Sequence, residues 1–313
     1  MNISNLKSFI ETYFIFISLI LLVLFFSVIT DNFFSFATLT TLLNQLPALT
    51  VVTIGMTLVL ICGGIDLSVG SLAALSGGVI GVTATQFGLP IPIAAILGII
   101  CATLAGALSG WLSSYCRLPA FIVTLGMLEA ARGLAYLTTD SQTLYIGFSI
   151  QKFALPLPYI GVSWSLILAV AVVIVGHLML TRTIFGRHII ATGTNEKAAQ
   201  ISGIQTKPVL LIVLAISGFL AGIGGLMNAA YLGTADPNAG LGLELAAIAA
   251  AVIGGTSLLG GRGSIIGAFI GVLIISVLQN GLAQLGVSEP SKRLITGAVI
   301  IIAVLIDRWR SNN

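Results

Sequence analysis

Long apolar runs follow one another along almost the whole chain, and few charged residues separate them. The run over residues 209–232 holds 24 residues without a single charge, and about 20 apolar residues suffice to cross a bilayer as an α-helix. Only 7% of the chain is charged, 57% is hydrophobic, and the mean hydropathy is +1.12, whereas soluble domains carry about 25% charged residues. This balance excludes a soluble enzyme, a disordered chain and a nucleic-acid-binding protein. It predicts an all-α polytopic membrane protein.

The apolar runs predict about ten transmembrane helices in a single membrane domain that covers residues 1–313. Pro47 is expected to open the second of them, after an amphipathic stretch over 34–46. The second and eighth runs end in glycine-rich turns and are candidates for broken or re-entrant helices, which a membrane allows only where protein or water shields the backbone. The expected spans are 8–30, 47–62, 69–86, 91–116, 118–139, 164–180, 209–232, 243–258, 264–285 and 294–306.

The distribution of basic residues orients these spans, because cytoplasmic loops carry an excess of Lys and Arg. If the N-terminus lies inside and the spans alternate, most of the 13 Lys and Arg residues fall on the inner side. Both termini are therefore expected in the cytoplasm, with 181–208 as a cytoplasmic loop and 140–161 on the outer side. The three cysteines and two histidines show neither disulfide nor zinc-ligand spacing, so no metal site is expected.

Charged residues inside apolar runs are the usual sign of function in a membrane protein. Asp66 could serve as an ion or proton site, or it could cap the third span together with Ser68, and its place just before an apolar run favours the cap. Glu129 and Arg132 stand three residues apart in the fifth span, where they could neutralise each other on one helix face. A structural ion pair is favoured over a transport-coupling site.

Uncharged polar and small residues also interrupt the apolar runs. Asn228, Gln279 and Asn280 could line a path for a hydroxylated solute or bond across helices, and the sequence leaves both readings open. Glycines four residues apart, such as Gly106 with Gly110, predict close helix packing. The chain has no phosphate-binding P-loop and no catalytic set, so neither enzymatic activity nor a cofactor of its own is expected.

The polar loop 181–208 has one ordered feature. Asn195 can cap a short helix over Glu196–Ile201, with an acidic residue in its first turn, and Gly203 can end it. Such a helix is too short to be stable alone in water. Its small face, Ala198 and Ala199, suits docking into a groove of a partner protein, although an ordinary capped connector explains the pattern equally well.

Nearly the whole chain resembles the membrane-spanning permease subunits of bacterial sugar ABC importers, the group for ribose, xylose, arabinose and galactose, with the ribose group nearest. The segment 59–71 is similar to the family signature Gly-Ile-Asp-Leu-Ser-Val-Gly-Ser, and 250–263 and Asn280-Gly281-Leu282 also match. The signature residues singled out are Gly64, Asp66, Ser68 and Gly70.

The resemblance also implies a role for the loop 181–208. It looks like the coupling loop that docks on the ATPase subunit, and its Glu-x-Ala-Ala pattern departs from the importers' Glu-Ala-Ala because Lys197 interrupts it. The residues expected to couple the permease to the ATPase are Asn195, Glu196, Ala198, Ala199, Ser202 and Gly203.

By the same resemblance, two permease subunits form a pathway in the bacterial cytoplasmic (inner) membrane. A sugar-binding protein delivers a monosaccharide, ribose or a related pentose or hexose, on the outer side. A separate ATPase subunit binds ATP on the inner side and switches the pair between outward-facing and inward-facing states. Two alternatives remain: an ABC permease for branched-chain amino acids, and an ion-coupled secondary transporter that uses Asp66 or the Glu129 and Arg132 pair.

Overall fold

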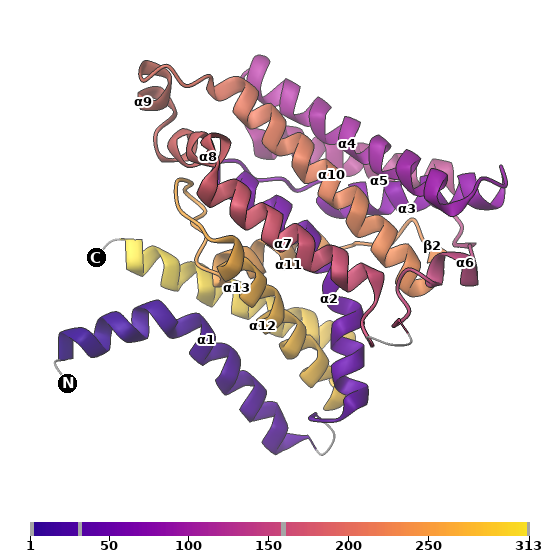
Figure 1. The fold of residues 1–313 in the computed structure, drawn as a ribbon, viewed down its shortest axis with the longest axis horizontal. Helices are drawn as coiled ribbons and strands as arrows, with labels where there is room; N and C mark the ends of the chain where they lie inside the picture. The colour runs from indigo at the N-terminus through magenta and orange to yellow at the C-terminus, as the bar shows by residue number, and fades with distance from the viewer. Residues whose placement is uncertain (1–2, 31–32, 158–160, 312–313) are drawn as a thin grey trace.

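The structure is a computed structural model that describes residues 3–30, 33–157 and 161–311 (Figure 1). Side chains are described from residue 15 onward, except at 300, 302–304 and 306–311. The first helices are α1 (Ile3–Ile29), α2 (Phe36–Ile61), α3 (Val69–Thr85), α4 (Ile91–Tyr115), α5 (Ala120–Thr138) and α6 (Phe148–Gln151). The later helices are α7 (Trp164–Arg182), α8 (Ile184–Thr194), α9 (Glu196–Ile201), α10 (Thr206–Leu232), α11 (Leu243–Ile253), α12 (Ile265–Gln284) and α13 (Glu289–Ser311).

Helices dominate the described chain, which agrees with the expected all-α class. The two strands found there, β1 (Leu144–Tyr145) and β2 (Thr234–Ala235), form one short antiparallel pair. Six described helices are long and apolar enough to cross a membrane: α2, α4, α5, α7, α10 and α12. This number is smaller than the ten expected spans. Helix α3 has 17 residues and α11 has 11, or about 25 and 16 Å at 1.5 Å per residue, against a hydrocarbon core of about 30 Å.

Pro47 does not open a helix, contrary to the sequence-based expectation. Helix α2 begins at Phe36, where the side chain of Ser35 accepts a hydrogen bond from Thr38 N, and it continues through Pro47. Pro47 lacks only one backbone donor, and it is buried in a helix that packs against α10, α12, α7 and α11. These neighbours stabilise a helix that the sequence pattern divides in two.

Helix α10 is the centre of the packing and contacts α4, α2 and α3 most extensively (Figure 1). Small residues make the close approach possible. A Cβ added at Gly218 would lie 2.9 Å from the Cα of Gly106 on α4, and one added at Gly222 would lie 2.9 Å from the Cα of Ile99. The predicted role of these glycines in helix packing is therefore confirmed.

Two short helices follow stretches of non-helical backbone. Residues 63–68 precede α3, and residues 236–242 precede α11. The two stretches meet where α3 begins, because a Cβ at Gly240 would lie 2.6 Å from the carbonyl oxygen of Gly70. Helix α11 ends at Ile253, well before residue 258, since Gly255 adopts a left-handed φ of +86°. Most residues of the two stretches are buried or half-buried, whereas Gly63, Asn238 and Leu241 are exposed, so the protein covers much but not all of this non-helical backbone.

Candidate functional site

The predicted short helix in the loop 181–208 is confirmed as α9. Asn195 is its N-cap, and its Oδ1 accepts a hydrogen bond of 3.0 Å from Ala198 N. Gly203 follows the helix with a φ of +86°, a left-handed conformation that glycine adopts without strain. Helices α8 and α9 lie at one end of the molecule, and β2 and α6 lie at the other (Figure 1).

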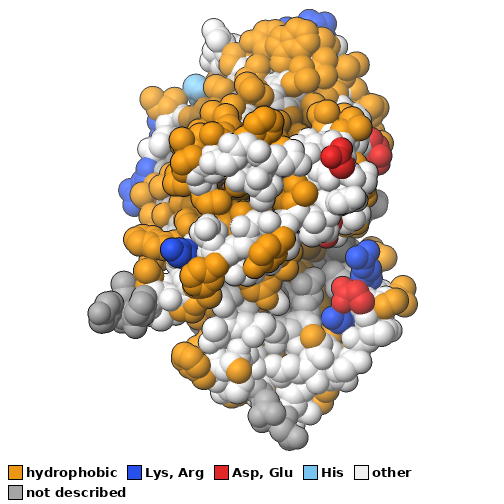
Figure 2. Space-filling view, turned by 90° about the vertical axis from the view of Figure 1, so that its right-hand side faces the viewer, with side chains coloured by type: hydrophobic (Ala, Val, Ile, Leu, Met, Phe, Trp, Pro, Cys, Tyr) orange, Lys and Arg blue, Asp and Glu red, His pale blue; other side chains and the backbone are white. Residues whose placement is uncertain are grey.

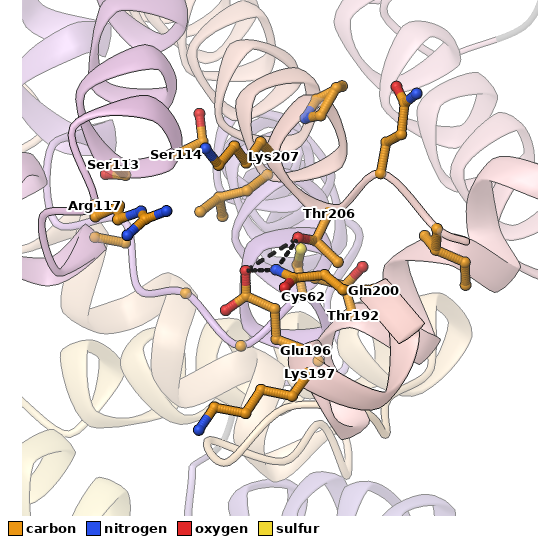
Figure 3. A pocket seen from close by; sticks show the side chains of 18 of the residues that line it. Cys62, Ser113, Ser114, Arg117, Thr192, Glu196, Lys197, Gln200, Thr206 and Lys207 are labelled. Atoms are coloured by element: carbon orange, nitrogen blue, oxygen red, sulfur yellow. Dashed lines mark hydrogen bonds between the residues drawn. The ribbon is translucent and has the colours of Figure 1, made fainter. Parts of the chain in front are cut away.

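A cavity of about 1120 Å³ opens beside α9, and we call it the α9 cavity. Glu196 forms the centre of a hydrogen-bond network on its wall: Glu196 Oε1 accepts bonds of 3.1 Å from both Gln200 Nε2 and Thr206 Oγ1 (Figure 3). Gln200 Nε2 also donates to Thr206 Oγ1 over 2.9 Å. Because Thr206 is the first residue of α10, this network joins the short helix to the central helix of the fold.

The α9 cavity carries more positive than negative charge. Three basic residues line it, Arg117, Lys197 and Lys207, against one acidic residue, Glu196. Arg117 lies in the turn between α4 and α5 with a φ of +57°, and Lys207 Nζ sits 5.7 Å from the centre of the Tyr115 ring. The cavity therefore suits an anionic group of a partner.

Three backbone segments cross in contact next to this cavity, and we call the contact the glycine crossing. Gly261 N donates a 2.9 Å hydrogen bond to the carbonyl oxygen of Ile61 at the end of α2. Gly193 of α8 packs on that bond: a Cβ there would overlap Ile61 O and lie 2.8 Å from Gly261 N. A Cβ at Gly260 would in turn lie 3.0 Å from the Cα of Gly63. The segment of α8 and α9 thus directly contacts the end of α2 and the turn between α11 and α12.

Asp66 is 1% exposed and receives three hydrogen bonds from two elements. Its Oδ1 accepts from Ser68 N at 3.0 Å and from Ser68 Oγ at 2.6 Å, and its Oδ2 accepts from Ser217 Oγ of α10 at 2.7 Å. Ser68 holds the N-cap position of α3, but its side chain makes no cap bond. Asp66 therefore closes a turn into α3 and ties that turn to α10.

The other signature glycines lie where the backbone is crowded. A Cβ at Gly70 would overlap the Glu244 carboxylate and the carbonyl oxygen of Gly240, and a Cβ at Gly64 would lie 3.1 Å from Cγ1 of Val59. The signature thus holds the start of α3 against α2 and the stretch before α11.

The structure does not pair Arg132 with Glu129. Arg132 is 8% exposed, and its Nη1 donates to the carbonyl oxygens of Pro237 at 2.5 Å and Ala239 at 2.9 Å. Glu129 is exposed on α5 and lies within electrostatic range of Arg132, but the one ion pair found among the described residues joins other groups. The expected close ion pair is not formed, because Nη1 of Arg132 is turned to two backbone carbonyls of a non-helical segment.

A second cavity, of about 550 Å³, lies between α2, α11, α12 and α13, and we call it the α12 pocket. Gln279 and Asn280 both line it, while Asn228 of α10 lines neither this pocket nor the α9 cavity. Glu289 forms an ion pair of 2.7 Å with Lys292, and the hydrogen bond and charge of Lys292 lower the pKa of Glu289. Amide and charged groups suit contacts with a hydroxylated solute.

Comparison with known proteins identifies the family. The family model described as branched-chain amino acid transport system / permease component matches residues 38–304. The chain is 38% identical over 297 residues to the ribose import permease protein RbsC of Escherichia coli K12, which covers 93% of this chain and 92% of that protein. It belongs to the ribose/xylose family of ABC permeases.

Other relatives agree. The ribose import permease protein RbsC of Bacillus subtilis is 38% identical to this chain, and the match covers 95% of this chain and 92% of that protein. The xylose transport system permease protein XylH of E. coli K12 is 33% identical with 97% and 93% covered. No solved structure matches the chain.

Family membership confirms several expectations at once. The chain is a multi-pass permease related to a protein of the bacterial inner membrane, and it is a transport subunit without catalytic activity. An ABC permease works with an ATPase and a binding protein, so the general class of partners follows as well. The ion-coupled secondary transporter considered from the sequence is overturned.

Sequence reasoning missed two parts of this geometry. Arg117 lies between α4 and α5 and Lys207 lies at the start of α10, and nothing in their spacing indicates a shared cavity with α9. The glycine crossing joins segments around 61, 193 and 261, of which only the first and last contain paired glycines. Those glycine pairs were a usable signal, since repeated glycines at helix ends often mark close backbone contacts.

Proposed function

We propose that two copies of this chain form the membrane pathway of an ATP-driven importer for a monosaccharide, with ribose the first candidate. The observation that carries the proposal is the identity of 38% over more than nine tenths of the chain to proteins named as ribose import permeases, against 32–33% to those named for xylose. The polar α12 pocket, with Gln279 and Asn280 on its wall, supports a solute with hydroxyl groups.

We further propose that α9 and its cavity bind the ATPase subunit, which carries the ATP. Support comes from α9, whose side chains are exposed except for the buried Ala199 of the expected docking face, from its cap by Asn195, and from the cationic α9 cavity beside it. The glycine crossing would carry a displacement of the 181–208 loop to the end of α2 and to the turn that leads into α12. The sugar-binding protein would then meet the opposite end of the molecule, where β1, β2 and α6 lie.

Uptake of radiolabelled sugars into right-side-out vesicles that contain ATP tests the importer. The candidate ATPase and binding protein are present or absent, and a protonophore collapses the gradient. We expect uptake that needs both partners and ATP and survives the protonophore, with ribose compared against xylose, galactose and a branched-chain amino acid. Uptake of leucine but of no sugar would instead support the second candidate, which the family description names.

Lys197→Glu tests the docking surface with little risk to the fold, because Lys197 is exposed and makes no hydrogen bond or ion pair among the described residues. We expect less ATPase to co-purify and uptake to fall, while the melting temperature stays unchanged. Glu196→Gln is the matched control, since an amide oxygen can still accept from Thr206. Full association of the Lys197→Glu variant with the ATPase would refute docking at α9.

A further inference from the structure

One charged side chain stands alone on the surface of a membrane-spanning helix. Glu129 is the tenth of the 19 residues of α5, and it is exposed. No hydrogen bond or ion pair reaches its carboxylate from the described part of the chain. Helix α5 packs chiefly against α3, with Val123, Thr124, Ala131, Arg132 and Ala135 buried in that contact. Glu129 is outside this buried set, although it lies within electrostatic range of Arg132.

The residues around Glu129 form an open strip of small side chains. Gly126, Ala130 and Gly133 share its face of the helix at helical spacing and are exposed. A Cβ added at Gly126 or at Gly133 would meet nothing within 4 Å. We call Gly126, Glu129, Ala130 and Gly133 the α5 strip. The helix therefore presents its backbone and one carboxylate to whatever lies beyond it.

Lipid does not suit this surface. An acidic side chain at the centre of a membrane helix is costly to expose to hydrocarbon, and such residues face a protein interior or a water-filled cavity. The neighbouring groups are mixed. Ile122 and Leu125 of the same helix face are exposed apolar side chains. Toward the end of α5, Tyr136 Oη donates to Asn238 Oδ1 at 2.6 Å, and Glu244 and Asp236 lie within electrostatic range of Arg132. In Figure 2 the acidic side chains lie on the right-hand side of the view, whereas Lys and Arg side chains lie on both sides.

We propose that the α5 strip lines the solute pathway, where Glu129 accepts hydrogen bonds from hydroxyl groups of the passing solute. The second copy of the chain supplies the opposite wall, so that Glu129 and its counterpart share one water-filled space. The glycines leave room for a pyranose-sized solute next to the carboxylate. This inference rests on the proposed function, because it names residues of the same pathway.

Thiol accessibility in the assembled importer tests the position of the strip. Ala130→Cys is made in a background in which exposed Cys116 is replaced by serine and treated with a membrane-impermeant methanethiosulfonate. We expect modification, and slower modification when transported sugar is present. Ile174→Cys on the exposed apolar face of α7 is the control, and it should stay unmodified because a thiol in lipid does not ionise. Equal protection of both cysteines would place the strip in lipid or in a dry contact and overturn the proposal.

Transport kinetics test the carboxylate itself. Glu129→Leu is expected to lower uptake by about tenfold or more, the usual effect of losing a hydrogen bond to a charged group, whereas Glu129→Gln should retain an intermediate rate. Association with the ATPase and the melting temperature should not change. Normal uptake by the Glu129→Leu variant would overturn the inference, and so would dissociation of this variant into single permease subunits. In either case, sugar uptake by the wild-type complex would still support the proposed function. Absence of sugar uptake by the wild-type complex would instead refute the function.

Discussion

Replacing Gly193 by alanine tests the glycine crossing more directly than any other change. The added methyl group would overlap Ile61 O and lie 2.8 Å from Gly261 N, so the 2.9 Å bond between those atoms has to break or shift. An unsatisfied buried backbone group costs about 1–3 kcal/mol, and overpacking adds about 1–3 kcal/mol. Alanine returns up to about 1 kcal/mol through its higher helix propensity, since Gly193 lies within α8. The expected net loss of unfolding free energy is about 2–4 kcal/mol.

Thermal unfolding followed by tryptophan fluorescence in detergent measures this loss. At about 2–4 °C per kcal/mol, Gly193→Ala should melt roughly 4–16 °C below the wild-type protein. Gly77→Ala is the matched control: Gly77 is also a helical glycine and is buried, but its added Cβ would come only within 3.8 Å of Gly225 O. The control should melt at or slightly above the wild-type temperature. A Gly193→Ala protein as stable as that control would show that the crossing does not constrain the α8–α9 loop.

Four further changes probe the other contacts. Ser217→Ala should lower stability by about 1–3 kcal/mol, because it leaves Oδ2 of the buried Asp66 carboxyl group without its hydrogen bond. Asp66→Ala should reduce folded protein in size-exclusion profiles more than it weakens solute binding. Full yield of Asp66→Ala with a specific transport defect would contradict a structural role. Arg132→Gln should release residues 236–242 and speed their cleavage by protease added at the β1–β2 end. An unchanged cleavage rate would show that the hydrogen bonds of Arg132 do not hold this segment in place. Asn195→Ala should weaken co-purification of the ATPase, because it removes an N-cap worth about 1 kcal/mol. Asn195→Asp should not, because aspartate also caps helices. Equal behaviour of the two variants would argue against a role for the cap.

What the sequence could predict was local. Nine residues contain all the signals that begin and end α9: a cap at Asn195, an acidic residue after it, and Gly203 past the end. The helix formed as expected. Arg132 shows the opposite case. A charge three residues from Glu129 suggests an ion pair on one helix, but the partners of Arg132 are backbone carbonyls 105 and 107 residues away. Every residue has a backbone carbonyl group, so the sequence does not indicate which carbonyl groups accept hydrogen bonds from Arg132.

Helix boundaries failed for a related reason. Apolar content marks 243–258 as a span, yet hydrophobicity alone does not distinguish a complete crossing from a helix that begins inside the protein. Helix α11 begins inside the protein because Gly240, in the stretch before it, packs closely on Gly70 at the start of α3. This contact forms only when both stretches are folded. Pro47 was misread because its tolerance within α2 depends on surrounding helices, which no local window contains.

The short length of α11 has a consequence for the synthesis of the protein. Its 11 residues are too few to be held in a bilayer alone, so α11 must enter the membrane together with α12, as a hairpin closed by the turn between them. Until that insertion occurs, the guanidinium of Arg132 stays without the carbonyls of Pro237 and Ala239, although α5 has long left the ribosome. Insertion of the α11–α12 hairpin is thus the event that anchors α5, and nascent chains that stop before residue 237 should hold α5 in the membrane only weakly.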